Sequence, residues 1–382
     1  MSHFYIRKED APVLPPPSSV VGPVHWLREN LFSNWLNSIL SLLAIYVLVT
    51  TIPGLIEYLF VNAVWDSVDG KACRPAGGGG PNPADWSGAC WSFTKAKFSF
   101  FMYGFYPHDL RWRVDLTGII GAIGIAMLLI EAIPYKRWTA VFMLFVYPVI
   151  AFILLSGGMF DLTYVETNKW GGILVTLVVA ITGIVVSLPL GIILALGRRS
   201  KMPAVRFASV LFIEIWRGVP LITVLFMASV MLPLFLPEGV HFDKLLRCLI
   251  GVALFSTAYM AEVVRGGLQA IVRGQYEGAQ ALGLSYWKTM GLIILPQALK
   301  LVIPGIVNTF IGLFKDTTLV LIVGILDLLG TVQTGLTDAK WFSPNTAATA
   351  YVFTAAIFWM FCFSMSRYSI YMERKLHTGH KR

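Results

Sequence analysis

The feature that most constrains this chain is a series of long apolar runs, each of the length needed to cross a lipid bilayer. A bilayer core of about 30 Å is crossed by roughly 20 residues of α-helix. Eight runs meet this requirement: 36–61, 115–133, 139–156, 170–197, 206–236, 246–264, 300–325 and 347–367. Apolar side chains make up 56% of the 382 residues and charged ones only 13%, which is unusual for a soluble domain. The sequence therefore predicts an all-α integral membrane protein with about eight transmembrane helices.

The basic residues favour an orientation with both termini in the cytoplasm. Apart from the long loop 62–114, the segments that would then lie inside carry far more Lys and Arg than those outside, as cytoplasmic loops do. In a soluble protein the net charge of +9 would suggest a nucleic acid partner. Here the basic residues cluster at the ends of spans, so we expect membrane lipid and no nucleic acid. Residues 1–34 lack the pattern of a cleaved signal and are predicted to be an uncleaved, partly disordered cytoplasmic tail, with a second tail over 373–382.

The loop 62–114 combines a Gly/Pro stretch, "RPAGGGGPNP", with the aromatic run "FSFFMYGFYP". That run is too short to cross a bilayer, and its aromatic side chains with Arg111 and Arg113 suit the headgroup zone. We expect an interfacial segment on the outer surface; if the run did cross, the following topology would invert. Cys73 and Cys90 share this loop, where a disulfide between them and two free thiols are both open.

The character of the chain changes near residue 165. From about Gly171 onward, ionisable residues appear inside the apolar runs. We therefore divide the chain into an N-terminal extension over 35–165, with three membrane helices and the long outer loop, and a core over 166–372.

An amphipathic cytoplasmic segment lies between the sixth and seventh runs. Gly274 can cap a short helix, Glu277 then falls in its first turn, and Gly283 supplies the left-handed residue that ends it. Ser285 can cap the next helix, which Pro296 interrupts.

Small residues at Gly278 and Ala279 leave one side of the short helix without bulky side chains. Such a helix can lie in a groove of another protein. The alternative is a loop that merely tolerates Gly and Ala, and spacing alone does not separate the two.

This segment resembles the cytoplasmic EAA signature of ABC importer permeases, E-A-A-x3-G-x9-I-x-L-P. The residues that match are Glu277, Ala279, Gly283, Ile293, Leu295 and Pro296, while Gly278 stands where the signature has Ala. The blocks "EIWRGVPLITVLF", "AYMAEVVRGGLQAI" and "NTFIGLFKDTTLVLIVGILDLL" are similar to those of the polar-amino-acid branch, and the resemblance covers about 170–372. The extension, with "GFYPHDLRWR", resembles that of the larger permease subunits of general L-amino-acid importers.

The resemblance implies a five-helix type I permease core in a bacterial inner membrane. It also implies four kinds of partner: a homologous second permease, two copies of an ATP-binding subunit, an extracytoplasmic amino-acid-binding protein and the amino-acid substrate. The EAA helix would be the docking site for the ATPase. The chain has no G-x4-G-K-[ST] phosphate loop and no cluster with metal-ligand or catalytic spacing. We therefore predict a transport subunit without a cofactor, driven by ATP hydrolysis in a partner.

Charged residues inside the fifth and sixth runs are candidates for the substrate pathway. Arg217 lies eleven residues into the fifth run, about 17 Å of helix rise, so it is predicted near mid-membrane. Glu214 shares its helix face and could neutralise it. Gly218 and Pro220 follow at once and predict a kinked or broken helix. Tyr259 and Glu262 add a ring and a carboxylate near the inner end of the sixth run.

A second polar island, Lys315, Asp316 and Thr317, lies in the seventh run. Adjacent residues of a helix point about 100° apart, so Lys315 and Asp316 are expected to need other partners. Either these groups pair across helices and fix the packing, or they line a pathway for an amino acid, which itself carries both charges. For Glu214 and Arg217 the two interpretations are equal, whereas the 315–317 island favours the pathway.

Two other classes of function are open on these features. An ion-coupled secondary carrier would also place charges inside the membrane, but it would be expected to show repeated halves, and we find no convincing internal repeat. A membrane enzyme or assembly scaffold would be a third class, and the chain shows no reactive constellation.

Overall fold

The computed structural model describes residues 22–130, 132–235, 237 and 242–376, and every named element within them is a helix. Seven helices are long and apolar enough to cross a membrane, and a bent pair makes an eighth crossing if it is counted as one span. The predicted all-α membrane fold is confirmed.

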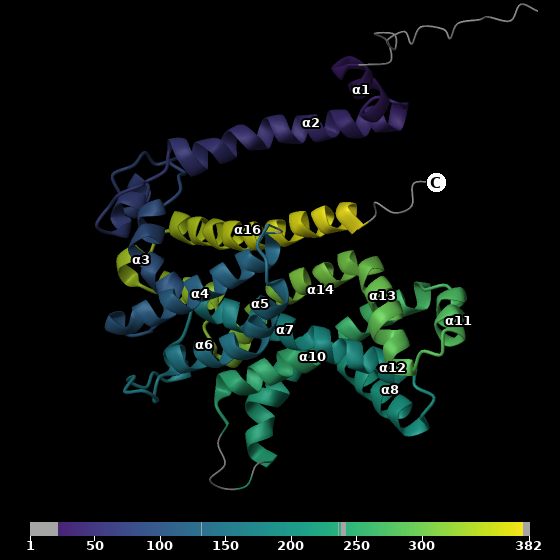
Figure 1. Ribbon diagram of the computed structural model, residues 1–382. Coiled ribbons are helices and arrows are strands. Elements are labelled where there is room, and N and C mark those ends of the chain that lie inside the picture. The colour runs from purple at the N-terminus through teal and green to yellow at the C-terminus, as the bar shows by residue number, and fades with distance from the viewer. Residues whose placement is uncertain (1–21, 131, 236, 238–241, 377–382) are drawn as a thin grey trace, which may run out of the picture.

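The extension contributes the first six α-helices, and Figure 1 shows the second of them running apart from the rest of the chain. Their bounds are α1 Pro23–Asn30, α2 Trp35–Ile56, α3 Trp91–Tyr103, α4 Arg111–Leu129, α5 Lys136–Val141 and α6 Tyr147–Ser156. Helix α2 continues as a π-helical turn to Val61, and another π-helical turn joins α5 to α6. The predicted tail over 1–34 thus contains a helix, α1, while residues 1–21 lie outside the described residues.

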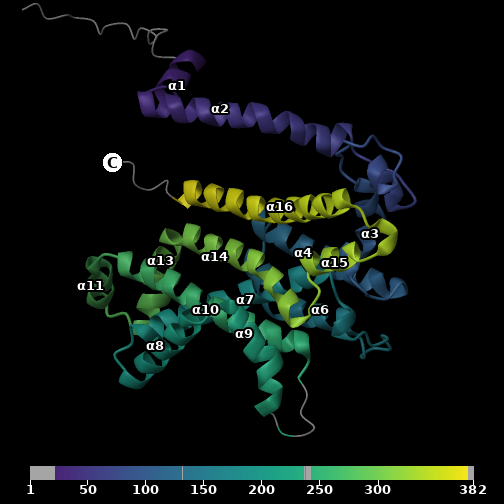
Figure 2. The ribbon, with the colours of Figure 1, turned by 180° about the vertical axis from the view of Figure 1, so that it is seen from behind.

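The core contributes ten further α-helices. Their bounds are α7 Ile173–Arg198, α8 Pro203–Gly218, α9 Leu221–Phe226, α10 Lys244–Ala270, α11 Arg273–Ala281, α12 Tyr286–Lys288, α13 Leu295–Leu301, α14 Ile303–Asp316, α15 Leu328–Leu336 and α16 Pro344–Leu376. Two ends of the core can be distinguished in Figures 1 and 2: α8, α11 and the C-terminal end of α16 lie at one, and α3 and α15 at the other.

Helices α7 and α10 pack closely at the centre of the core, because glycines on α7 leave room for large side chains. A Cβ built on Gly191 would come within 2.8 Å of Met260 on α10, and one on Gly183 within 2.7 Å of Leu313 on α14. Small residues at such positions let membrane helices approach one another. Small residues also let α4 approach the α5–α6 segment, where Gly121 faces Tyr147 and Gly124 faces Met143.

The fifth apolar run is not one straight helix. Helices α8 and α9 meet at an angle of 102°, with Val219 and Pro220 both in extended conformations. Proline has no N–H to donate, and it disfavours helical geometry in the residue before it. The predicted break after Gly218 is therefore confirmed, and the single crossing over 206–236 is corrected to two short pieces.

Several spans differ from the apolar runs at their ends. Helix α10 continues to Ala270, beyond the predicted end at 264, because Glu262 and Arg265 are held in ion pairs and do not end the helix. Helix α16 continues to Leu376, inside the tail predicted for 373–382. Residues 377–382 lie outside the described residues.

The aromatic outer segment packs against the core along one side. It forms α3, whose Phe93 and Phe101 are fully buried and pack edge to face against each other. Phe93 also contacts the ring of Trp341. Arg113, expected in the headgroup zone, is 3% exposed and donates to the Thr163 carbonyl at 2.8 Å. Other aromatic side chains of this segment stay open, since Phe98 and Phe105 are 49% and 56% exposed. Helix α3 packs against α15 and α16, which Figure 2 shows beside it, and its placement at the membrane surface stays a prediction.

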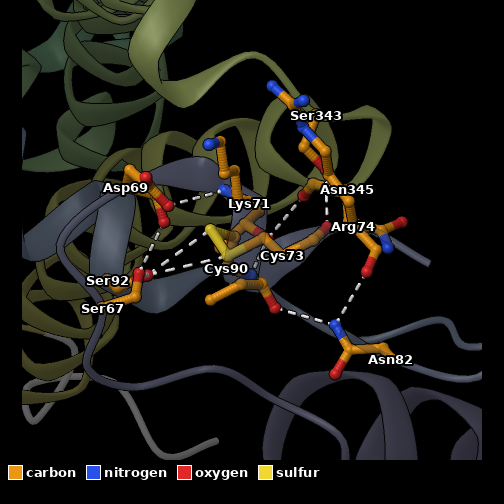
Figure 3. Close-up of a disulfide and its surroundings, with 12 residues drawn as sticks. Ser67, Asp69, Lys71, Cys73, Arg74, Asn82, Cys90, Ser92, Ser343 and Asn345 are labelled. Carbon is orange, nitrogen blue, oxygen red and sulfur yellow. Dashed lines mark hydrogen bonds between the residues drawn. A yellow bond between two sulfur atoms is a disulfide. The ribbon is translucent and has the colours of Figure 1, made fainter. Parts of the chain in front are cut away.

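Cys73 and Cys90 form a disulfide, so of the two possibilities left open by the sequence the structure shows the bonded one. Figure 3 shows that the bonded cysteines lie against the chain that connects α15 to α16. Ser343 donates to the Cys73 carbonyl at 2.6 Å, and the Cys90 N–H donates to the Thr349 hydroxyl at 2.7 Å. We refer to the contacts between residues 58–97 and 338–349 as the outer clasp.

An ion pair strengthens the outer clasp. The Lys97 ammonium lies 2.6 Å from a carboxylate oxygen of Asp338, and this hydrogen bond lowers the pKa of Asp338. Arg74 also donates to the Phe342 carbonyl, at 2.9 Å. The extension is thus fastened to the core at its outer end by a disulfide loop, a salt bridge and several backbone contacts.

Replacing both Cys73 and Cys90 by serine is expected to lower the stability of the purified protein by about 3 kcal/mol, because the disulfide closes a loop of 17 residues and restricts the unfolded chain. Thermal unfolding in detergent measures the change. The matched control is Cys362→Ser, which removes a free cysteine and should leave the midpoint unchanged. An unfolding midpoint of the double variant equal to that of the wild type would contradict a structural role for the disulfide.

Candidate coupling segment and charged cluster

The signature segment, residues 273–296, begins two residues after α10 ends. Its first helix is α11, and Val272 before it has an extended backbone and makes no side-chain cap. The prediction that Gly274 caps this helix is wrong. Extended geometry suits the β-branched Val272, so the helix starts at Arg273 and Glu277 lies beyond the first turn.

The end of α11 follows the prediction. Gly283 has a φ of +68°, its N–H donates to the Gln280 carbonyl at 2.9 Å, and the Leu284 N–H donates to the Ala279 carbonyl at 3.2 Å. This pair of bonds is a Schellman motif, which needs a left-handed residue and is usually closed by glycine. The backbone of Gly283 therefore fixes where the helix stops and the chain turns.

The two small residues of α11 do not share one open side. Ala279 is 2% exposed and packs against its own chain, whereas Gly278 is exposed and a Cβ built on it would meet nothing within 4 Å. Successive helical residues point about 100° apart, which explains the difference. Large apolar side chains are exposed before and after α11, since Val272, Leu282 and Trp287 are 68%, 77% and 73% exposed.

The second half of the signature packs against the core. Ser285 occupies the cap position of the next helix without a side-chain hydrogen bond, and this helix continues through a π-helical stretch into α13. Pro296 falls in the first turn of α13, so the predicted interruption is a widened stretch and not a break. Ile293 and Leu295 pack against a buried group that includes Ile294.

A charged cluster joins the C-terminal parts of α7, α8 and α10. Its centre is Glu262, which is 14% exposed at its side chain. One oxygen lies 2.8 Å from Arg198, and the other lies 2.6 Å from Arg265 and 3.7 Å from Arg217. The remaining member, Glu214, pairs with Arg198 at 2.9 Å. Three arginines and two glutamates leave this cluster with one excess positive charge.

One prediction about this cluster is corrected. Glu214 does not neutralise Arg217: it pairs with Arg198 of α7, and Arg217 turns to Glu262 and lies 5.7 Å above the ring of Tyr259. Arg217 also does not lie within one continuous span, because the bend at Pro220 ends α8 directly after it; its depth in the membrane stays a prediction. Sequence reasoning treated Arg198 and Arg265 only as basic residues of inner loops, although their place at span ends next to buried carboxylates was a usable signal.

In the second polar island, the described part of the chain supplies no ion pair to Lys315 or Asp316. Lys315 is exposed and Asp316 half-buried, and neither forms an ion pair with another described residue. The prediction that the two do not satisfy each other is therefore confirmed. Thr317 is buried and donates to the Phe314 carbonyl at 2.8 Å, so its hydroxyl serves the end of α14.

Comparison with known proteins agrees with the signature segment. The family described as "Binding-protein-dependent transport system inner membrane component" matches residues 187–378. The inner membrane amino-acid ABC transporter permease protein YhdY of Escherichia coli K12 is 53% identical over 355 residues, which is 93% of each chain. The chain belongs to this permease family. Membership leaves the ion-coupled carrier without support, and it makes the chain a non-enzymatic transport component.

Two further relatives show how the permease family varies in length. The glutamate/glutamine/aspartate/asparagine transport system permease protein BztC of Rhodobacter capsulatus is 41% identical over an alignment of 439 positions, gaps included, which covers 99% of each chain. The glutamate/aspartate import permease protein GltK of Escherichia coli O6:H1 is 30% identical over 210 residues, which is 91% of its length but only 53% of this chain. Some permeases of the family therefore correspond to only about half of this chain.

The variant Glu262→Gln is expected to lose about 2 kcal/mol of stability, because it leaves three guanidinium groups without their shared carboxylate. The matched control is Glu214→Gln, which removes a carboxylate that is 54% exposed and paired once and should cost less than about 1 kcal/mol. Thermal unfolding in detergent compares the two. Equal losses in both variants would show that Glu262 is not the centre of the cluster.

Proposed function

We propose that this chain is a permease subunit of an ATP-binding-cassette importer for amino acids and forms half of its translocation pathway. The observation that carries the proposal is α11: a short, solvent-exposed helix that ends in a glycine turn, inside the region matched by the permease family. The first half of the signature segment, α11, presents an open face, and the second half, from Ser285 to Pro296, is anchored in the core. Such an element can receive force from a partner and pass it to the membrane helices.

The assembly we propose contains a homologous second permease, two copies of an ATP-binding subunit and an extracytoplasmic amino-acid-binding protein. The family works together with such partners in general, and the copy number is our proposal. The chain carries no phosphate loop, so ATP must be bound by the partner.

We also propose that both termini lie in the cytoplasm, with residues 1–34 and 373–382 as tails. The disulfide at the opposite end of the molecule from α11 supports this orientation, because disulfides persist outside the cytoplasm. We propose further that a boundary near residue 165 separates the extension from a core over 166–372, and GltK, which aligns over 210 residues, is close to this core in length.

The open face of α11 suits close contact with a folded protein groove. Gly274 and Gly278 present bare backbone, with open space around each. The exposed apolar side chains of Val272, Leu282 and Trp287, before and after α11, would bury a large surface on contact, which is where most binding free energy arises. Glu277 adds one exposed carboxylate that a basic residue of the ATPase could pair with.

The variant Gly283→Val tests docking at this helix. Valine at a φ of +68° is strained by roughly 1–3 kcal/mol, so the turn after α11 should shift and displace Glu277. We expect several-fold less ATPase to co-purify and a matching loss of uptake, with normal insertion in the membrane. The control is Gly278→Ala, which restores the alanine of the signature in open space and should behave as the wild type. Normal ATPase co-purification with Gly283→Val would sink the docking proposal.

For the charged residues we propose two separate roles. Glu214, Arg217, Tyr259 and Glu262, with the arginines around them, hold the inner ends of α7, α8 and α10 together, since their charges are already paired within the chain. Lys315 and Asp316 are the better candidates for the substrate pathway, because they offer both signs of charge and have no described ion partner. Thr317 shapes the helix end beside them.

The variant Asp316→Asn tests the pathway proposal. It keeps the size of the side chain and removes the charge, so the complex should assemble and hydrolyse ATP while uptake of amino acids falls at least several-fold. The control Asp316→Glu keeps the charge and should retain more uptake. Loss of the assembled complex, and not only of uptake, would show instead that Asp316 has a structural role.

A further inference from the structure

The two arginines that end α7 reach different partners. Arg198 points to the charged cluster, where it contacts Glu214 and Glu262. Arg199, the next residue, donates to the Leu268 carbonyl at 2.8 Å and to the Tyr276 hydroxyl at 2.9 Å. Its guanidinium also lies over the ring of Tyr276, 5.4 Å from the centroid. Because adjacent side chains diverge, the end of α7 is joined at once to α8, α10 and α11.

The position of Leu268 explains why an arginine suits this place. Leu268 lies in the last turn of α10, where carbonyl groups have no partner within the helix and carry partial negative charge. The Tyr276 hydroxyl also donates to this carbonyl, at 3.2 Å. Arg199, Leu268 and Tyr276 therefore form a closed triangle of three hydrogen bonds, which we refer to as the inner latch.

In the described part of the chain, side chains of α11 form hydrogen bonds to other helices at two places, and the inner latch is one of them. The other links Gln275 of α11 to Gln297 of α13 at 3.1 Å. The chain itself connects α11 to α10 through two extended residues, Ile271 and Val272, which transmit little sideways force. Tyr276 and Arg199 therefore give α11 a direct polar link to the end of α7, beside the apolar packing that joins the two through Met290 and Ile294.

We propose that Arg199 and Tyr276 are positioning residues that transmit movement of α11 to the ends of α7 and α10, and through Arg198 to the charged cluster. This inference rests on the proposed function, in which α11 docks on the ATPase. The latch is separate from the docking face, because Tyr276 is half-buried and turned toward the core. Removing the latch should therefore leave ATPase binding intact and lower the amount of amino acid taken up per ATP hydrolysed.

The decisive variant is Tyr276→Phe, which removes one oxygen atom and keeps the ring under the guanidinium. The whole complex, with its ATPase and binding protein, is reconstituted in vesicles, and amino-acid uptake and ATP hydrolysis are measured together. We expect uptake per ATP to fall about fivefold, with unchanged ATPase co-purification and thermal midpoint. The control is Tyr286→Phe, another tyrosine near Arg199, which has no hydrogen bond from its hydroxyl among the described contacts and should keep the wild-type ratio.

A second variant tests whether the two residues act as one link. Arg199→Lys keeps a cation near the α10 carbonyls but loses the stacked fork, so its ratio should lie between those of the wild type and Tyr276→Phe. The double variant should be no worse than the more severe single one, since both remove the same link. Additive losses would overturn the single-link proposal.

The outcomes separate this inference from the proposed function. An unchanged ratio in Tyr276→Phe, with normal ATP-driven uptake by the wild type, overturns the latch alone. Reduced ATPase co-purification in that variant also overturns it, because Tyr276 would then belong to the docking face. Absence of ATP-driven uptake in the wild-type complex overturns both.

Discussion

The end of this permease that carries α8 and α11 depends on the pairing of one carboxylate, Glu262, with three arginines. A charge at the end of a membrane span is costly unless it is compensated, and here compensation requires that α7, α8 and α10 meet at one place. Arg198 and Arg217 supply it from the neighbouring helices, and Arg265 from the same helix. The bend at Pro220 follows directly on this arrangement, because α8 ends at Gly218, one residue after Arg217.

Local chemistry made some parts of this structure predictable. Long apolar runs identify the spans because the bilayer admits little else, Pro220 breaks its helix because it lacks an N–H, and Gly283 ends α11 because its backbone must turn left-handed. The predicted cap at Gly274 was wrong because several helix starts fit the same polar stretch. The observed start depends on the extended backbone of Val272, which follows the end of α10. Local rules therefore located the elements better than they located their first residues.

Contacts between distant segments were not predictable in the same way. Glu214 has a helical neighbour of opposite charge at the right spacing, yet it pairs with Arg198 on another helix, since the fold brings a better-placed cation to it. The burial of Phe93 and Phe101 depends on α15 and α16, which lie more than two hundred residues later in the chain. Lys315 and Asp316 behaved as expected because the prediction concerned only their mutual geometry.

The isolation of α2 has a consequence for how this part of the protein is constrained. Its apolar window buries no residue within the described chain, so lipid, or a neighbouring subunit, must act as its solvent. Among the described residues, no other helix covers this apolar window and so specifies its side chains. Its length and general hydrophobicity are what the fold requires, and leucine, isoleucine and valine should be interchangeable along it. The length of helix α2 is thus more strongly constrained by the fold than the identity of its individual side chains.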